Sequence, residues 1–281
     1  THVSADDYHR YDRKQRTERG LTPLSPECNY VDVLERHLAH LRAGEPILKP
    51  VYRHKDGCFQ APEYVRPAEF TIVEGLLGFH TAAMRELYDV RLFLDPPEDL
   101  RREWKVRRDC SRRGYTTDQV LAELDLREAD AEAYVRPQQR YADILISFMP
   151  GDRGDQDHLD AKVALRPGLV HPDLSALAGG DTNGIMVVER GSETCLWVPG
   201  TIDADHSAEI QEAIWGRMHF ASHLRTERLG EFTVGTQLHR SESLAITQLL
   251  VLYQLVTARA AVAVGAVGTR ADRTSAAGSM A

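Results

Sequence analysis

The chain has 281 residues, of which 42% are hydrophobic, and a formal net charge of −8 at pH 7. That length supports one large domain or two small ones with a substantial core. The negative charge disfavours a general nucleic-acid or membrane-surface role, so we expect neither nucleic acid nor membrane as a partner. The four cysteines form no CxxC pair. This excludes the usual zinc and disulfide frameworks and favours a cytoplasmic location.

Strand and helix patterns alternate through the first half of the chain. Residues 1–5 indicate the tail of a strand, and Asn29 is a candidate N-cap for a helix over residues 30–43. Pro50 disfavours a central strand at the extended residues 47–52. Further strands are predicted at 70–73, 90–94 and 142–148, and further helices at 80–88, 98–110 and 117–127. The alternation predicts an α/β fold with a mostly parallel sheet flanked by helices.

The second half has a different pattern, which predicts additional antiparallel strands. The predicted elements are a loop at 151–160, strands at 184–190, 193–198 and 232–238, and helices at 207–218 and 242–259. No apolar run reaches the roughly 18 residues needed to span a bilayer. The predicted organisation is a kinase-like core over 1–148, a continuation of the same domain over 149–260, and a disordered tail over 261–281.

Charged residues are expected to meet at one edge of the predicted sheet. Ligands of such sheets bind beyond the carboxyl ends of the strands, where Asp6, Glu74 and the segment 95–113 would gather. The segment 98–113 holds seven Lys or Arg residues against four Asp or Glu residues, which favours a local anion site. The alternative is a solvated helix face.

These residues match the needs of phosphoryl transfer, which requires a base, a metal-binding carboxylate and cations around the phosphate. Asp6 is the candidate base, and its alternative is a turn or N-cap aspartate. Glu74 is the candidate metal ligand, and its alternative is an ordinary strand exit. Arg13 and Arg113 are candidate phosphate clamps, or else surface arginines. His9 and His54 are candidate hydrogen-bond donors to a sugar or phosphate, or else structural histidines.

A phosphate loop is not recognisable in these residues. The motif GxxxxGK[ST] requires a Gly-Lys step, and none of the five lysines follows a glycine. The 281 residues alone therefore show no cradle of this type for ATP phosphates.

Five separated blocks nevertheless occur in a familiar order. They are Asp6-Asp7-Tyr8-His9 with Asp12-Arg13-Lys14-Gln15-Arg16, Lys49-Pro50-Val51-Tyr52-Arg53-His54, Val73-Glu74-Gly75-Leu76, Arg108-Asp109 with Arg112-Arg113-Gly114-Tyr115, and Pro137-Gln138 with Tyr141-Ala142-Asp143. In this order they resemble phosphoribulokinase, a family of P-loop kinases related to uridine kinase. Uridine kinases share the Glu-Gly and Arg-Asp blocks but lack the first run, which favours ribulose 5-phosphate as the substrate. Less specific blocks at 219–223 and 240–243 resemble bacterial members.

The resemblance implies a cytoplasmic transferase of the Calvin cycle that moves the γ-phosphoryl group of ATP to ribulose 5-phosphate with Mg²⁺, and that forms a homodimer or a larger homo-oligomer. Asp6 would take the proton from the sugar's C1 hydroxyl, and both Glu74 and Asp6 would lie near Mg²⁺. The residues that would bind the sugar phosphate or lie near the lid over ATP are His9, Arg13, Tyr52, His54, Lys105, Arg108, Asp109 and Arg113. Arg127 matches a position linked to nucleotide response.

One departure from the family pattern affects activity. The chain begins where the family already has a strand, the phosphate loop and a helix, and we expect a truncated form of the enzyme, because the substrate motifs that follow are all intact. Two alternatives stay open: a nucleoside kinase of the uridine type, and a non-catalytic protein that binds a sugar phosphate.

Overall fold

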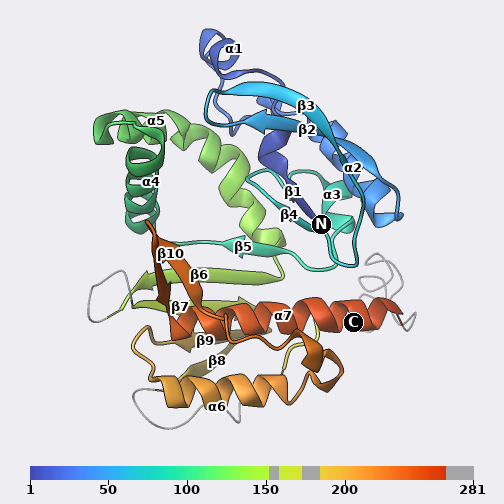
Figure 1. Cartoon of the computed structure of the whole chain (residues 1–281), viewed down its shortest axis with the longest axis vertical. Coiled ribbons are helices and arrows are strands. Elements are labelled where there is room, and N and C mark those ends of the chain that lie inside the picture. Colours follow the sequence, from blue (N-terminus) through green and yellow to red (C-terminus); the bar gives the residue numbers. More distant parts are fainter. Residues whose placement is uncertain (152–157, 173–183, 264–281) are drawn as a thin grey trace. The chain divides into compact units, whose positions relative to one another are not determined.

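The computed structural model describes residues 1–151, 158–172 and 184–263, apart from the side chains of residues 112 and 113. These residues form two compact units, whose segments are Thr1–Tyr88 with Arg101–Tyr141, and Asp89–Leu100 with the chain from Ala142 onward. The predicted α/β class is confirmed, because helices accompany both parallel and antiparallel strand pairs (Figure 1). The predicted single domain over 1–260 stays a prediction. Of the predicted tail, residues 264–281 lie outside the described residues.

The first unit contains short strands, a two-stranded ribbon and helices. Its elements are β1 (His2–Ser4), the 3-10 helix η1 (Ala5–Tyr8), α1 (Arg13–Glu18), η2 (Pro26–Cys28), α2 (Val31–Arg42), β2 (Ile47–Arg53), β3 (Cys58–Val65), β4 (Ile72–Glu74), α3 (Ala82–Glu86), most of α4 (Glu98–Arg113), α5 (Thr117–Asp130), the π-helical η3 (Ala131–Val135) and η4 (Arg136–Tyr141). Strand β1 pairs in parallel with β4, and β2 pairs in antiparallel fashion with β3.

Helix α2 packs its apolar stripe against β1 and η1. Leu34, Leu38 and Leu41 are buried together with Val3 and Tyr8 in one hydrophobic cluster. Each such side chain contributes roughly 1.5–3 kcal/mol by leaving water, so this cluster holds η1 in place. The helix predicted at 30–43 is therefore confirmed.

The predicted N-cap of α2 is wrong. Tyr30 occupies the N-cap position and makes no side-chain cap, while Asn29 hydrogen-bonds to His9 instead. An asparagine before an apolar run favours a cap, but here a long-range partner takes its side chain.

The ribbon β2–β3 carries an irregularity at Pro50. Its register shifts between Lys49 and Val51, as expected where a proline lacks the N–H that a ladder needs. Strand β3 was not predicted, because all but its last residue are exposed and no inward–outward alternation marks it.

The second unit is built on a five-stranded sheet of order β5-β6-β7-β9-β8. Its elements are β5 (Leu92–Leu94), β6 (Ile144–Pro150), β7 (Leu159–Leu165), β8 (Met186–Arg190), β9 (Glu193–Val198), α6 (Ala204–Trp215), η6 (His219–Leu224), β10 (Glu231–Val234), β11 (Gln237–Arg240) and α7 (Glu242–Ala263). Strands β5 and β6 are parallel, and the other pairs in this sheet are antiparallel. The expected antiparallel strands are thus present, and β7 is an additional one.

The hairpin predicted around residues 191–192 is confirmed by the pair β8–β9. The prediction of a single strand over 232–238 is wrong, because these residues belong to the hairpin β10–β11. Of the predicted loop at 151–160, residues 152–157 lie outside the described part of the chain, and β7 begins within its last two residues.

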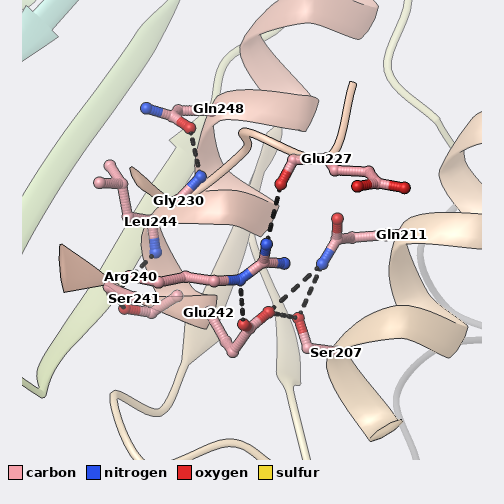
Figure 2. Close-up of polar contacts among 10 residues, drawn as sticks. Ser207, Gln211, Glu227, Gly230, Arg240, Ser241, Glu242, Leu244 and Gln248 are labelled. Atoms are coloured by element: carbon pink, nitrogen blue, oxygen red, sulfur yellow. Dashed lines mark hydrogen bonds and ion pairs between the residues drawn. The ribbon is translucent and has the colours of Figure 1, made fainter. Parts of the chain in front are cut away.

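A polar network joins α6 to the start of α7 (Figure 2). Glu242 accepts hydrogen bonds from Ser207 Oγ at 2.7 Å and from Arg240 Nε at 2.6 Å. Burial opposes ionisation of Glu242, but these hydrogen bonds hold its pKa below its usual value. The Arg240–Ser243 block is therefore a structural joint in this unit.

Helix α7 is long and apolar enough to cross a membrane by length and composition alone. The expectation that no such segment exists was therefore wrong. A core helix passes the same test, and α7 contacts both α6 and β7 and buries residues such as Ile246 and Leu249.

Candidate functional site

The first unit places Asp6 beside Glu74. Ser4 and Glu74 are partners in the parallel pair β1–β4, and Asp6 follows Ser4 by two residues in η1. Gly75 has φ +139°, and a Cβ atom there would lie 2.6 Å from the Cβ of Ala5. The Glu-Gly sequence therefore allows the end of β4 to approach η1 closely.

The carboxyl group of Asp6 has a distinctive electrostatic environment. Burial raises its pKa, and the negative charge of Glu74 raises it further, while His54 and Arg108 act in the opposite direction. Among the described residues, no hydrogen bond to this carboxylate is formed. A carboxylate that is partly buried, repelled by a neighbour and free of structural hydrogen bonds is typical of functional positions.

Asp7, the next residue, has a structural role. Its carboxylate forms an ion pair with Lys49 Nζ and accepts a hydrogen bond from the backbone N–H of Tyr52 at 2.9 Å. The side chains of Asp7 and Lys49 are only 14% and 7% exposed. This pair ties the ribbon to η1, and the contrast distinguishes the two aspartates.

The rings of His9, Tyr52 and His54 form one aromatic cluster. His9 and Tyr52 meet edge to face with centroids 4.6 Å apart, and the centroids of Tyr52 and His54 are 5.1 Å apart. Burial, with a smaller effect of the Arg16 charge, lowers the pKa of His9 to about 4. His9 is therefore neutral at pH 7. The three predicted sugar-site residues thus lie together.

Arg13 is held at the turn of the ribbon. Its backbone N–H donates to Gly57 O at 2.9 Å, and its Nη2 donates to His54 O at 2.5 Å. Gly57 has φ +75°, and a Cβ atom there would lie 2.6 Å from the Cβ of Arg13. The hairpin turn therefore positions this guanidinium.

Arg16 lies at the candidate site, although no pattern in the sequence predicted a role for it. It is 9% exposed, and its guanidinium carbon lies 5.5 Å from the centroid of the Tyr52 ring. Arg16 Nη1 and the Tyr52 hydroxyl are both buried without a hydrogen-bond partner. Two neighbouring donors left unsatisfied suit an anion. The signal in the sequence was the spacing of three from Arg13 on a helix, which places the two arginines on one face.

Helix α4 adds two cations organised by one buried carboxylate. Asp109 is 4% exposed and accepts hydrogen bonds from Lys105 Nζ at 3.2 Å and Arg108 Nε at 2.9 Å. Burial opposes ionisation of Asp109, but these partners hold its pKa below its usual value. Arg108 is close enough to Asp6 to influence its pKa. The predicted convergence of the amino end with the basic segment is thus present for Arg108.

Arg127 on α5 lies in the same electrostatic neighbourhood. It forms an ion pair with Glu123, and burial, together with the charge of Arg16, lowers its pKa. Burial and the charge of Arg127 in turn lower the pKa of Lys105. The side chain of Arg113, the other predicted phosphate clamp, lies outside the described residues.

The donor set suits Mg²⁺ better than a transition metal. Within the described part of the chain, no group of three or more His, Cys, Asp or Glu residues is placed to hold a metal ion. Mg²⁺ usually keeps several waters and is bound through one or two carboxylates together with substrate phosphates. Asp6 and Glu74, whose charges interact, fit that requirement.

A model of the Phosphoribulokinase / Uridine kinase family matches residues 1–153. A phosphoribulokinase of Synechocystis sp. is 37% identical over 150 residues, covering 53% of this chain and 45% of the relative. A chloroplastic phosphoribulokinase of Triticum aestivum is 30% identical over 203 residues, covering 71% of this chain and 48% of the relative. The chain thus spans about half the length of the curated relatives it matches.

Among solved structures, the phosphoribulokinase from Rhodobacter spheroides superposes with a TM-score of 0.55 at 21% identity, covering 80% of this chain and 88% of that chain. This likeness shows a shared fold.

Proposed function

The chain belongs to the Phosphoribulokinase / Uridine kinase family, and we propose that it carries the sugar-phosphate site of an ATP-dependent kinase acting on ribulose 5-phosphate. The observation that carries the proposal is Asp6. Its carboxylate has a raised pKa, forms no hydrogen bond within the described part of the chain, and lies within the electrostatic reach of Glu74, His54 and Arg108.

In this proposal Asp6 accepts the proton of the sugar hydroxyl as that oxygen attacks phosphorus. A base near a strand end, in partial burial, has the pKa tuning that general-base catalysis requires. The buried donors Arg16 Nη1 and Tyr52 Oη bind the phosphate that the sugar already carries. Arg13 lies beside this cluster and adds a further positive charge.

The α4 cations lie nearer the reacting end of the sugar in this scheme. Arg108 offsets negative charge close to Asp6, and Lys105 is held by Asp109 for the same purpose. When bound at Asp6 and Glu74, Mg²⁺ supplies positive charge for the phosphate oxygens. We also propose that Arg127 contributes to nucleotide binding, that the protein is cytoplasmic and that it forms a homodimer. Free cysteines are typical of proteins in the reducing cytoplasm. Analytical ultracentrifugation of the full chain would measure the oligomeric state.

Calorimetry on the full chain tests the binding half of the proposal. We expect ribulose 5-phosphate to bind and uridine not to bind. Arg16→Met should weaken the sugar phosphate about tenfold or more, because a hydrogen bond to a charged group is lost from a buried position. Binding of uridine instead would favour the nucleoside-kinase alternative, and equal affinity in Arg16→Met would exclude the anion site.

A coupled assay of ATP consumption tests the catalytic half. Asp6→Asn should lower kcat by several orders of magnitude with little change in ribulose 5-phosphate affinity. A fully active Asp6→Asn variant would exclude Asp6 as the base. If the unmodified chain binds the sugar phosphate but shows no turnover, the alternative of a non-catalytic protein that binds a sugar phosphate would be favoured.

A further inference from the structure

The side chains of His9 and Asn29 form a buried pair. His9 Nδ1 lies 2.7 Å from Asn29 Oδ1, and the two residues are 4% and 7% exposed. Histidine nitrogens either donate or accept, depending on the tautomer. The partner of each nitrogen therefore decides what the ring offers to a ligand.

The orientation of the Asn29 amide is determined by two further hydrogen bonds. Its Nδ2 donates to Pro23 O at 3.0 Å and to Ser25 O at 2.8 Å. If the amide were flipped, its oxygen would face two carbonyl oxygens, and all three groups are acceptors. Oδ1 must therefore face His9, and because an amide oxygen only accepts, the hydrogen lies on His9 Nδ1.

The backbone holds this pair in place. His9 and Asn29 are partners in an antiparallel bridge. The flanking hydrogen bonds run from Arg10 N to Cys28 O and from Tyr30 N to Tyr8 O, both at 2.7 Å. Such a bridge fixes the relative position of the two Cα atoms, so the side-chain contact is pre-organised.

The ring of His9 carries a single hydrogen at neutral pH. Its pKa of about 4 follows from burial and from the nearby charges of Arg16 and His54, which outweigh the hydrogen bond to Asn29 and the charge of Asp7. The single N–H is used by Asn29. Nε2 therefore presents a lone pair, and it has no hydrogen-bond partner in the described part of the chain. A lone pair repels phosphate oxygens and accepts from a hydroxyl.

We propose that Asn29 is a positioning residue that fixes His9 as the Nδ1–H tautomer, so that Nε2 accepts a hydrogen bond from a hydroxyl of the sugar. This rests on the proposed function for the identity of the ligand. It reverses the expectation that His9 donates to the sugar or phosphate. Arg16 Nη1 and Tyr52 Oη then bind the phosphate group of the sugar phosphate, while His9 accepts a hydrogen bond from one of its hydroxyl groups.

Nitrogen-15 NMR of the histidine-labelled full chain tests the tautomer without any ligand. The His9 signals are assigned by comparison with His9→Gln. At pH 7 we expect a neutral ring with the hydrogen on Nδ1 and an unprotonated Nε2. A hydrogen on Nε2, or a charged ring at pH 7, would overturn the proposal. Because the unmodified protein is used, misfolding of a variant does not affect this result.

Two ligands then separate hydroxyl recognition from phosphate recognition. Ribulose 5-phosphate should shift the His9 Nε2 resonance in the direction of an accepted hydrogen bond. Sulfate, which carries no hydrogen at neutral pH, should leave Nε2 unprotonated and unshifted. A sulfate-induced shift, or bound ribulose 5-phosphate without a shift, would contradict hydroxyl recognition. If ribulose 5-phosphate does not bind, the proposed function and its sugar contact both fail, while the ligand-free spectrum still decides the tautomer.

Asn29→Asp tests the positioning role directly. A carboxylate beside Nδ1 favours the charged ring, which raises the pKa of His9 and removes the lone pair from Nε2. We expect affinity for ribulose 5-phosphate to fall about tenfold as that hydrogen bond is lost, and a sulfate response to appear at Nε2. An unchanged pKa of His9 in Asn29→Asp would show that residue 29 does not control the charge state of His9.

Discussion

The adjacent residues Asp6 and Asp7 have different surroundings, and these surroundings indicate a different role for each. Asp7 is tied to Lys49 and to the Tyr52 backbone, whereas Asp6 has neighbouring charges but no hydrogen bond among the described residues. The sequence Asp-Asp alone does not tell them apart. The structure does so because hydrogen bonding lowers the free energy of a charged carboxylate, while burial and like charge raise it.

Replacement of Asp6 should make the protein more stable. The pKa of Asp6 in the folded state lies above its value in the unfolded state. The contribution of this carboxyl group to the free energy of unfolding is therefore fully present below the unfolded pKa, and it is lost as the pH rises through the folded pKa. Asp6→Asn removes that loss, and its Tm at pH 7 should exceed that of the unmodified chain. Thermal unfolding between pH 3 and 8 measures this, and the two curves should converge in acid. A lower Tm for Asp6→Asn throughout would show that the carboxylate is stabilising.

The acid limb of the pH–rate profile should respond to Glu74. The negative charge of Glu74 helps to raise the pKa of Asp6, so Glu74→Gln should move the acid limb of kcat to lower pH by a fraction of a unit to about one unit. Glu123→Gln serves as a control, because Glu123 pairs with Arg127 on α5. An acid limb that stays in place in Glu74→Gln would show that the two carboxylates are not coupled.

At the scale of elements, the ribbon β2–β3 is joined to η1, which carries Asp6 and Asp7, by a buried ion pair. Lys49→Met leaves the Asp7 carboxylate without its cation and should cost about 3 kcal/mol, since an uncompensated buried charge is left behind. The double variant Asp7→Asn, Lys49→Met should recover part of this loss. Urea unfolding of all four proteins in the cycle gives the coupling energy, and purely additive losses would show that the pair carries no coupling.

The turn of the same ribbon should be sensitive to a single methyl group. Gly57→Ala meets the Cβ of Arg13 at 2.6 Å with φ +75°, and should weaken ribulose 5-phosphate binding as well as cost about 1–2 kcal/mol. Gly20→Ala is a matched control, since its φ is +63° and nothing lies within 4 Å of the added Cβ. If both variants bind the sugar phosphate equally, the turn does not position Arg13.

The elements predicted correctly from the sequence are those with a stripe of buried apolar side chains or with a clear turn residue at one end. Helix α2 and the hairpin β8–β9 belong to this group, because apolar spacing and the turn at residues 191–192 determine them locally. Strand β3 was missed because its exposed residues carry no pattern. Asn29 was misassigned as a cap because its partner, His9, is 20 residues away, and local propensity does not contain that information.

The candidate site followed the same rule. Asp6, Glu74 and the α4 cations were predicted because strand ends and a basic helix mark them in the sequence, and the family resemblance added the sugar-site histidines and Tyr52. The burial of Arg16 and the unsatisfied hydroxyl of Tyr52 emerged only from packing. Roles that depend on long-range burial could not be read from residue spacing alone.

At the scale of the whole molecule, the chain forms two compact units, and the candidate site lies in only one of them. The site residues belong to the first unit, in the segments Thr1–Tyr88 and Arg101–Tyr141. The second unit supplies the five-stranded sheet, with α7 in contact with its strand β7. The joint at Glu242 (Figure 2) is saturated with internal hydrogen bonds. A ligand of the first unit should therefore leave the local stability of this joint unchanged.

Hydrogen exchange of the full chain with and without ribulose 5-phosphate is the most direct test of the claim that distant segments form one sugar-phosphate site. We expect slower exchange in three segments together, residues 5–16, 49–59 and 105–127, because each contributes groups to the proposed site and ligand binding suppresses local opening. The segment 204–215 of α6 should exchange as before. Slowing confined to the second unit, or in only one of the three segments, would contradict the account.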